Sequence, residues 1–329
     1  MTMFFSVIIP VYNRPDEINQ LLKCFVHQTY KNFEILIIES GSTIKADQVV
    51  NTFKEYLSVN YFYKNNEGQG ISRNFGMRHA NGDYFVILDS DVYIEHNFLE
   101  NIYLYLKKDW LDCYGGPDKL HPESNEIQKA IDFCMTSFLT TGGIRGKKFR
   151  IGKFYPRSFN MGFSRKVFEK TKGFKLPCKG EDIELSARII KLGFKTGLIP
   201  NAIVYHKRKN NLSDFFKQMV FFGKARINVF AMHKETLRLI HLIPLIFCSG
   251  LIFSFVLPFL LKSIFAYLGL CLYALYFLTI FTLATLKYRN AKIGYLTVIA
   301  TFYQMIGYAY GILLESFNRM YRKILSFKK

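Results

Sequence analysis

The sequence predicts an α/β domain with a mostly parallel sheet, followed by a helical membrane region. Two observations lead to this prediction. Apolar runs of strand length alternate with helical patterns in the first part of the 329 residues, where charged residues are frequent. After about residue 240 come three long uncharged stretches, Leu242–Leu261, Ser263–Leu286 and Ile293–Leu314. Each is long enough to supply the about 20 apolar residues that cross a bilayer.

Strands are expected where apolar runs are bounded by turn residues, and helices where apolar residues recur at helical spacing. The expected strands are Phe4–Val11, Phe33–Ile38, Asn60–Tyr63, Asp83–Leu88, Phe159–Phe163, Phe194–Ile199 and Ala202–Tyr205. The expected helices start near Pro15, cover Asp47–Leu57, run from the loop Asn65–Gly70 to Ala80, cover Arg165–Thr171, and start at Glu181. This alternation of strand and helix predicts a mostly parallel sheet covered by helices on both faces.

Three of these strands end in polar loops, at Pro10–Arg14, Glu39–Ser42 and Asp89–Asp91. The carboxyl ends of parallel strands are where such sheets bind their ligands, so the loops are expected to share one crevice. Asp89 and Asp91 would repel each other unless a proton or a cation lies between them. A divalent cation bridging to a diphosphate fits this pair. The alternative is that one of the two merely caps the next helix.

Two further segments have two interpretations each. Glu181 and Asp182 open a helix, where the helix dipole favours acids, so they are either capping residues or catalytic carboxylates. The stretch Thr140–Lys153 is rich in glycine and lysine. It is either a solvated loop or a lid over phosphates.

Charge and cysteine content limit the class of protein. The formal net charge is +19, and the basic residues surround hydrophobic segments. This favours anionic lipid headgroups and a diphosphate ligand over nucleic acid, for which no recognition motif is present. The six cysteines are scattered without C-x-x-C spacing, which indicates buried thiols and neither a zinc site nor a disulfide framework.

Met1–Ile9 is too short for a signal peptide, so we expect the first domain in the cytoplasm, attached to the inner or cell membrane.

The order of the motifs resembles that of the family 2 glycosyltransferases of the GT-A fold. The segments that carry the resemblance are SVIIPVYNRPD, EILIIESGS, NNEGQGISRNFGMRHANGDYFVILDSD and GEDIELSARIIKLGFK, within Phe5–His206. The resemblance implies a membrane-bound enzyme that transfers a sugar, with inversion, from a nucleotide-diphosphate sugar to a hydroxyl of a glycan or lipid-linked acceptor. A nucleotidyltransferase and a non-catalytic membrane scaffold that keeps the fold are the alternatives.

The resemblance also implies roles for individual residues. Asp182 matches the general base, with Glu181 beside it. Asp91 matches the direct ligand of Mn²⁺ or Mg²⁺, with Asp89 nearer the sugar or ribose and His206 as a further contact to metal or phosphate. The implied nucleotide-sugar contacts are Pro10, Tyr12, Asn13, Glu39, Arg73, Asn74 and Asp89. Glu39 and Ser40 stand where the family commonly has two acids, which leaves open which nucleotide base the enzyme accepts.

The expected domains are a GT-A domain over 1–212, amphipathic interfacial or linker helices over 213–240, transmembrane helices within 241–315 and a basic tail over 316–329. Phenylalanines alternate with basic residues in Ser213–Leu239, which indicates interfacial helices or packing under the catalytic domain. We expect three crossings because Ile293–Leu314 has full length and no charge. The alternative is two crossings plus a re-entrant or interfacial helix, because this stretch is the most polar and a third crossing would export the basic tail.

Overall fold

The computed structural model describes residues 3–142, 154–261 and 263–326, and these residues form two compact units. The first unit consists of Met1–His121 and Lys153–Lys207, and the second of Pro122–Gly152 and Arg208–Lys329. Residues 122–142 thus pack with the C-terminal helices, whereas we expected them inside a domain over 1–212. Most of the expected phosphate lid, from residue 143 to Lys153, lies outside the described residues.

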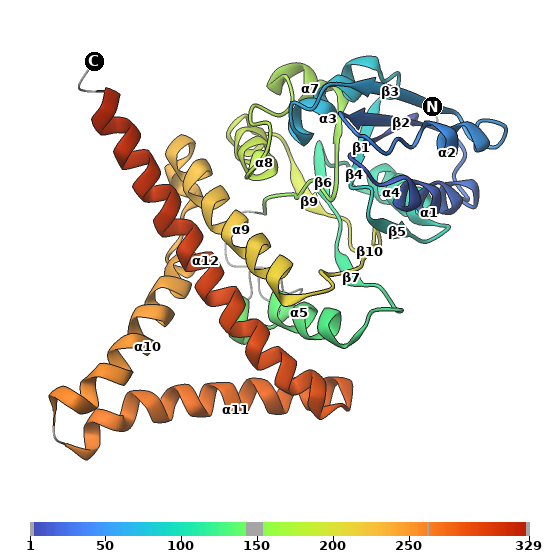
Figure 1. Cartoon of the computed structure of the whole chain (residues 1–329). Helices are drawn as coiled ribbons and strands as arrows, with labels where there is room; N and C mark the ends of the chain where they lie inside the picture. Colours follow the sequence, from blue (N-terminus) through green and yellow to red (C-terminus); the bar gives the residue numbers. More distant parts are fainter. Residues whose placement is uncertain (1–2, 143–153, 262, 327–329) are drawn as a thin grey trace. The chain divides into compact units, whose positions relative to one another are not determined.

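The first unit contains two sheets and the helices that cover them (Figure 1). Its strands are β1 Phe5–Val11, β2 Phe33–Ser40, β3 Val59–Lys64, β4 Tyr84–Leu88, β5 Val92–Ile94, β6 Cys113–Gly115, β7 Asp118–Leu120, β8 Asn160–Ser164, β9 Thr196–Leu198 and β10 Val204–His206. Its helices are α1 Pro15–Val26, α2 Asp47–Thr52, α3 Gln69–His79, α4 Phe98–Lys108, α7 Arg165–Thr171 and α8 Glu181–Lys191.

The larger sheet is mostly parallel, as expected. Among the described residues its strand order is β3-β2-β1-β4-β8-β6-β9, and β8 is antiparallel to both of its neighbours. β1 lies between β2 and β4 and is parallel to both. The carboxyl ends of these three strands therefore lie side by side at one edge. The smaller sheet has the order β5-β10-β7 and pairs Val92, which follows Asp91, with His206.

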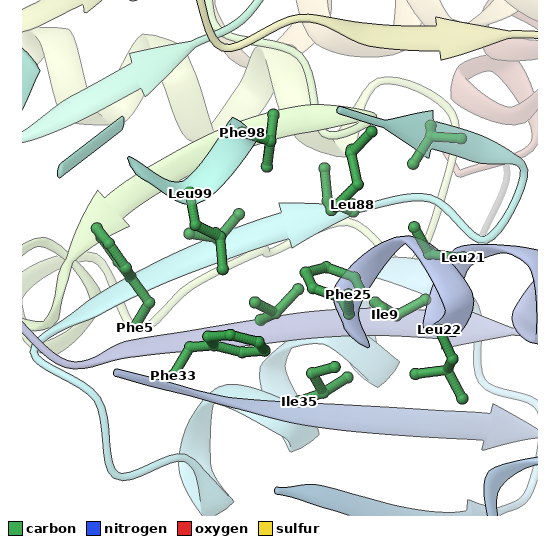
Figure 2. Close-up of a cluster of buried hydrophobic side chains, with 14 of the residues drawn as sticks. Phe5, Ile9, Leu21, Leu22, Phe25, Phe33, Ile35, Leu88, Phe98 and Leu99 are labelled. Atoms are coloured by element: carbon green, nitrogen blue, oxygen red, sulfur yellow. The ribbon is translucent and has the colours of Figure 1, made fainter. Parts of the chain in front are cut away.

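Alternating side chains of the parallel strands fill a core on each face of the larger sheet. Figure 2 shows one of these cores, in which apolar residues of β1, β2 and β4 meet those of α1 and α4. Phe5 and Ile9 of β1 point into this core, whereas Ile8 belongs to the cluster on the opposite face with residues of α3 and α8. Burying each large apolar side chain contributes about 1.5–3 kcal/mol, which holds the strand ends in fixed positions.

One helix is shorter than the sequence predicts. The helix expected over Asp47–Leu57 ends at Thr52, and the chain continues in turns. Leu57 and Val59 are both buried against the core, so the chain must leave the helix to deliver them there. Tertiary packing thus overrides the local helical pattern.

The second unit is helical in its described residues. Its elements are α5 Glu126–Thr136, α6 Phe138–Thr141, α9 Leu212–Met232, η1 Lys234–Thr236, η2 Leu239–Leu242, α10 Ile243–Leu260, η3 Ile264–Tyr267, α11 Leu268–Tyr288 and α12 Ala291–Ser326. Three helical segments, Leu239–Leu260, Ile264–Tyr288 and Ala291–Ile324, are long and apolar enough to cross a membrane. Only about a tenth of each of the first two is buried, but half of the third. With 36 residues, α12 is also longer than the expected stretch Ile293–Leu314.

Candidate active site

The carboxylates of Asp89 and Asp91 and the imidazole of His206 come together where β4 ends. One ligand atom from each of the three lies within 4.8 Å of the others. His206 reaches this point because β10 pairs with β5, the short strand that follows Asp91. Two ligands of Mg²⁺ bound at about 2.1 Å lie no more than about 4.2 Å apart, so a small side-chain movement would let the three hold one cation. Carboxylates with an imidazole suit Mn²⁺ as well.

Asp91 is surrounded by positive charge. Its Oδ1 lies 2.9 Å from Nε2 of His206, and its Oδ2 accepts a hydrogen bond of 3.2 Å from Arg14. Burial acts to raise the pKa of Asp91, but the hydrogen bonds and charges of His206 and Arg14 lower it overall. Burial acts to lower the pKa of His206, but Asp91 raises it above its usual value. Asp91 is therefore ionised, as a metal ligand must be.

Arg73 connects the Asp89 side of this site to the second pair of acids. Its side chain is fully buried, and its guanidinium donates to Oδ1 of Asp89 at 2.7 Å and to Oε1 of Glu181 at 3.1 Å. Gln69 donates a further bond of 2.6 Å to the same oxygen of Glu181. Burial and then the charge of Asp182 raise the pKa of Glu181, while Arg73 acts against this rise. Arg73 and Glu181 thus form a buried link between α3, β4 and α8.

The Arg73→Met substitution is expected to destabilise the first unit strongly. Breaking a buried ion pair leaves an uncompensated charge, here on Glu181, at a cost of about 3–5 kcal/mol. The midpoint of thermal unfolding of the purified chain should fall by roughly 6–20 °C. Lys195→Ala is the matched control, because its ion pair with Asp109 is exposed and is worth about 1 kcal/mol at most. Equal midpoints for the two variants would contradict the bridging role.

Asp182 lies at the first turn of α8, next to Glu181. Its Oδ1 accepts a hydrogen bond of 2.7 Å from the backbone N–H of Ile183, and its Oδ2 pairs with Nε of Arg157 at 2.9 Å. The Asp182 side chain keeps 12% of its surface exposed and Arg157 keeps 33%. Both interpretations of the acids at this helix start are thus compatible with the geometry, because Asp182 binds the helix N-terminus and also remains accessible.

The loops after β1 and β2 hold each other in place. The backbone of Asn13 has a positive φ of 54°, and its side-chain oxygen accepts bonds from the backbone N–H groups of Thr43 and Ile44. Tyr12 is half exposed beside it, and Pro10 is partly buried. This part of the site can offer an aromatic ring to a base or ribose.

Three of the implied nucleotide-sugar contacts are turned toward protein. Glu39 is fully buried, and its Oε2 accepts bonds from the N–H of Ala46 and the hydroxyl of Tyr61. The side-chain amide of Asn74 donates a hydrogen bond to the carbonyl of Phe174 and accepts one from its backbone N–H. Arg73 is fully buried, as described above. In this structure these side chains shape the site from behind.

The structure also brings in residues that sequence reasoning did not single out. Glu17 accepts hydrogen bonds of 2.9 Å from both Arg14 and Ser90 and so ties α1 to the loop that carries Asp91. A cleft of about 160 Å³ opens beside them. Its lining residues are Glu17, Gln20, Ser90, Asp91, Val92, Tyr93 and Lys207. The i,i+3 spacing of Arg14 and Glu17 could have indicated their pairing, whereas no local pattern indicates that Arg157 meets Asp182.

The chain is similar to known proteins over these same elements. The model of the family described as "Glycosyl transferase family 2" matches residues 6–172. An uncharacterized glycosyltransferase of Rickettsia bellii is 41% identical over 95 residues, which are 29% of this chain and 14% of that protein. The dolichyl N-acetyl-alpha-D-glucosaminyl phosphate 3-beta-D-2,3-diacetamido-2,3-dideoxy-beta-D-glucuronosyltransferase of Methanococcus voltae is 27% identical over 233 residues, which are 68% of this chain and 73% of that protein.

Among solved structures, the chain resembles the mannosyltransferase PcManGT from Pyrobaculum calidifontis, solved in complex with GDP-Man and Mn²⁺. The TM-score is 0.65 with 16% sequence identity, and the match covers 92% of this chain and 86% of that chain. At this identity the likeness shows the fold. It extends over most of the chain, including the C-terminal helices.

Proposed function

Because the chain belongs to glycosyl transferase family 2 and has a GT-A fold followed by apolar helices, we propose that it is a membrane-bound inverting glycosyltransferase. It would transfer a sugar from a nucleotide-diphosphate sugar to a hydroxyl of a glycan or lipid-linked acceptor. The observation that carries this proposal is the joining of the Asp89–Asp91–His206 cluster to the acids of α8 through the buried Arg73. A scaffold that merely kept the fold would not need the Asp89–Asp91–His206 cluster.

Asp91, Asp89 and His206 would hold a divalent cation, Mn²⁺ or Mg²⁺, which supplies positive charge against the diphosphate of the leaving group. The Mn²⁺ in the complex of the Pyrobaculum calidifontis mannosyltransferase supports this choice. Tyr12, Asn13 and Pro10 would line the pocket for the nucleotide base of the donor. Glu39, Arg73 and Asn74 would hold that pocket and Asp89 from behind, because Oε2 of Glu39, the two terminal nitrogens of Arg73 and the amide of Asn74 bind protein.

Asp182 would act as the general base that takes the proton of the attacking hydroxyl. Its carboxylate is partly exposed, and the Arg157 guanidinium holds one of its oxygens in place. A single base that activates the acceptor opposite the leaving group leads to direct displacement and inversion at the anomeric carbon. Glu181 would be a positioning residue, since Arg73 and Gln69 engage its carboxylate.

A lipid-linked acceptor agrees with two observations. The second unit offers apolar helices long enough to cross a membrane. The Methanococcus voltae relative is named for transfer to a dolichyl-linked sugar phosphate. We therefore propose an integral membrane protein with the first unit in the cytoplasm.

The test is a panel of nucleotide-diphosphate sugars offered to the purified full chain with membrane lipids, with and without Mn²⁺. We expect one class of donor to be consumed and its nucleoside diphosphate to be released. Release of sugar 1-phosphate, with the nucleotidyl group moved to the acceptor, would favour the nucleotidyltransferase alternative, and no consumption of any donor would favour a scaffold.

Arg157 is expected to be a positioning residue for Asp182. Arg157→Ala removes the group that orients the base, so kcat should fall about tenfold or more while the KM for the donor stays within a few-fold. Arg157→Lys keeps a positive charge but not the planar fork of donors, and should recover part of the loss. A large rise in donor KM in both variants would contradict this role and make Arg157 a donor contact.

A further inference from the structure

One face of α12 is polar or small, and protein covers it within the second unit. Thr297 and Thr301 are fully buried, and the thiol of Cys134 in α5 lies 3.4 Å from the Thr297 carbonyl and from the Thr301 hydroxyl. One turn further, Gln304 donates a bond of 3.0 Å to the carbonyl of Thr140. Three of the polar residues that distinguish this stretch in the sequence, Thr297, Thr301 and Gln304, thus face α5 and α6.

The same face continues against α9, which runs beside α12 (Figure 1). A Cβ on Gly311 would lie 2.2 Å from the backbone oxygen of Val220, so the two helices touch backbone to backbone. Farther along, Arg319 donates a bond of 2.8 Å to Asn228. The contact with α9 therefore extends over the second half of α12.

The opposite face of α12 is apolar and exposed along the helix. Its exposed large residues are Tyr295, Tyr303, Ile306, Tyr310, Leu313, Phe317, Met320, Tyr321 and Ile324, mostly three or four residues apart. Tyrosines occur along this whole stripe, from one end to the other. In a spanning helix, tyrosine is enriched only at the two ends, where the headgroups lie. A one-sided stripe of this kind is typical of a helix that lies in the interface.

The charged residues of α9 argue against a crossing of the bilayer by α12. The rings of Phe216 and Tyr303 are in contact, with centroids 6.0 Å apart. If residues 293–314 crossed the bilayer, Tyr303 would lie near its middle, and so would the neighbour of Phe216, Lys217. The side chain of Lys217 is 74% exposed, and that of its partner Asp214 is 48% exposed. Each such charge would cost about 2.5–3.5 kcal/mol at the bilayer centre.

The helices α10 and α11 differ from α12 in each respect. They are apolar on all sides, and only about a tenth of each candidate span is buried. They pair with each other, and Tyr273 of α11 donates a bond of 2.7 Å to the carbonyl of Phe247 in α10. Figure 1 shows α10 running across the line of α12 and not along it. A bilayer that α10 crosses steeply would therefore not be crossed in the same direction by α12.

We propose that the chain crosses the membrane twice, through α10 and α11, and that α12 lies in the interface with its aromatic stripe against the acyl chains. Lys287 and Arg289 just before α12, Lys292 in its first turn and Arg322 near its end would lie at the level of the anionic headgroups. The two ends of the chain would then lie on the same side of the membrane. This inference does not depend on the reaction proposed above.

Reporters fused to the full chain test the number of crossings. We expect a reporter before Met1 and one after Lys329 to lie on the same side of the membrane, and one inserted between Leu261 and Ser263 to lie on the other. A tail on the side opposite the N-terminus would contradict the proposal in favour of three crossings. All three reporters on one side would contradict the crossing of α10 and α11.

Depth measurements test the orientation of α12 directly. The chain has one tryptophan, so a Trp110→Phe background allows a single new Trp to be placed at Tyr303, Tyr310 or Phe317. Quenching by lipids labelled at different depths should put all three at one shallow depth. A steady change of depth through the bilayer centre from position 303 to 317 would overturn the proposal.

Discussion

Replacing Asp91 by asparagine is expected to lower the rate of sugar transfer by about 10²–10³-fold, with the fold intact. The variant keeps the shape of the side chain but loses the negative charge that would hold a divalent cation beside the leaving diphosphate, an effect worth several kcal/mol. The single amide oxygen of asparagine can accept from Arg14 or from His206 but not from both, so the midpoint of thermal unfolding should fall modestly while the chain still folds. Mn²⁺ binding, followed by calorimetry, should weaken in parallel with the rate.

Asp109→Asn is the matched control for this variant, because Asp109 is an exposed acid paired with Lys195. It removes one negative charge from the same unit and should leave both rate and metal affinity unchanged. Normal turnover of Asp91→Asn at saturating donor and metal would contradict the assignment of Asp91 as a metal ligand.

Replacing Asp182 by asparagine is expected to reduce transfer by about 10²–10⁴-fold, which is the usual contribution of a general base. The amide still accepts the hydrogen bond from Ile183 but cannot take the proton of the acceptor hydroxyl. Since the base acts on the acceptor, the affinity for the nucleotide sugar, measured by calorimetry, should stay within a few-fold.

Glu184→Gln provides a control on the same helix. Glu184 is fully buried and pairs with Arg188 at 2.6 Å, so its loss should lower thermal stability but not kcat of the folded enzyme. A collapse of donor affinity in Asp182→Asn would make this residue a donor contact and would leave the acceptor without its base.

The sequence predicts those parts of the fold and site that depend on local pattern. The runs of β1, β2 and β4 are mostly apolar because both of their faces are buried, with Ser6 and Glu34 hydrogen-bonded to each other as exceptions, and their ends carry polar residues. A parallel sheet then necessarily brings Asn13, Glu39 and Asp89 to one edge. The glycine-rich loop Asn65–Gly70 also indicates that another segment of backbone packs closely against it. A Cβ on Gly70 would lie 2.3 Å from the carbonyl oxygen of Leu176.

Long-range pairings could not be derived in this way. Arg73 and Asn74 match the family motif, but only the three-dimensional structure shows that their polar groups face protein. The pairing of Arg157 with Asp182 joins residues 25 positions apart through the fold and has no local signal. The helix α5 is not among the elements expected from the sequence, although its capping box of Asn125 and Gln128 is a local signal for a helix start.

The most direct test of the account is the fate of the donor and the acceptor in one reaction. The purified full chain in lipid vesicles, given its preferred nucleotide sugar and a lipid acceptor extract, should yield nucleoside diphosphate and a lipid heavier by one sugar residue in equal amounts, by mass spectrometry. Both products should disappear in Asp182→Asn. Formation of both products at the normal rate by Asp182→Asn would contradict the assignment of the general base. Cleavage between the two phosphates of the donor would contradict sugar transfer itself.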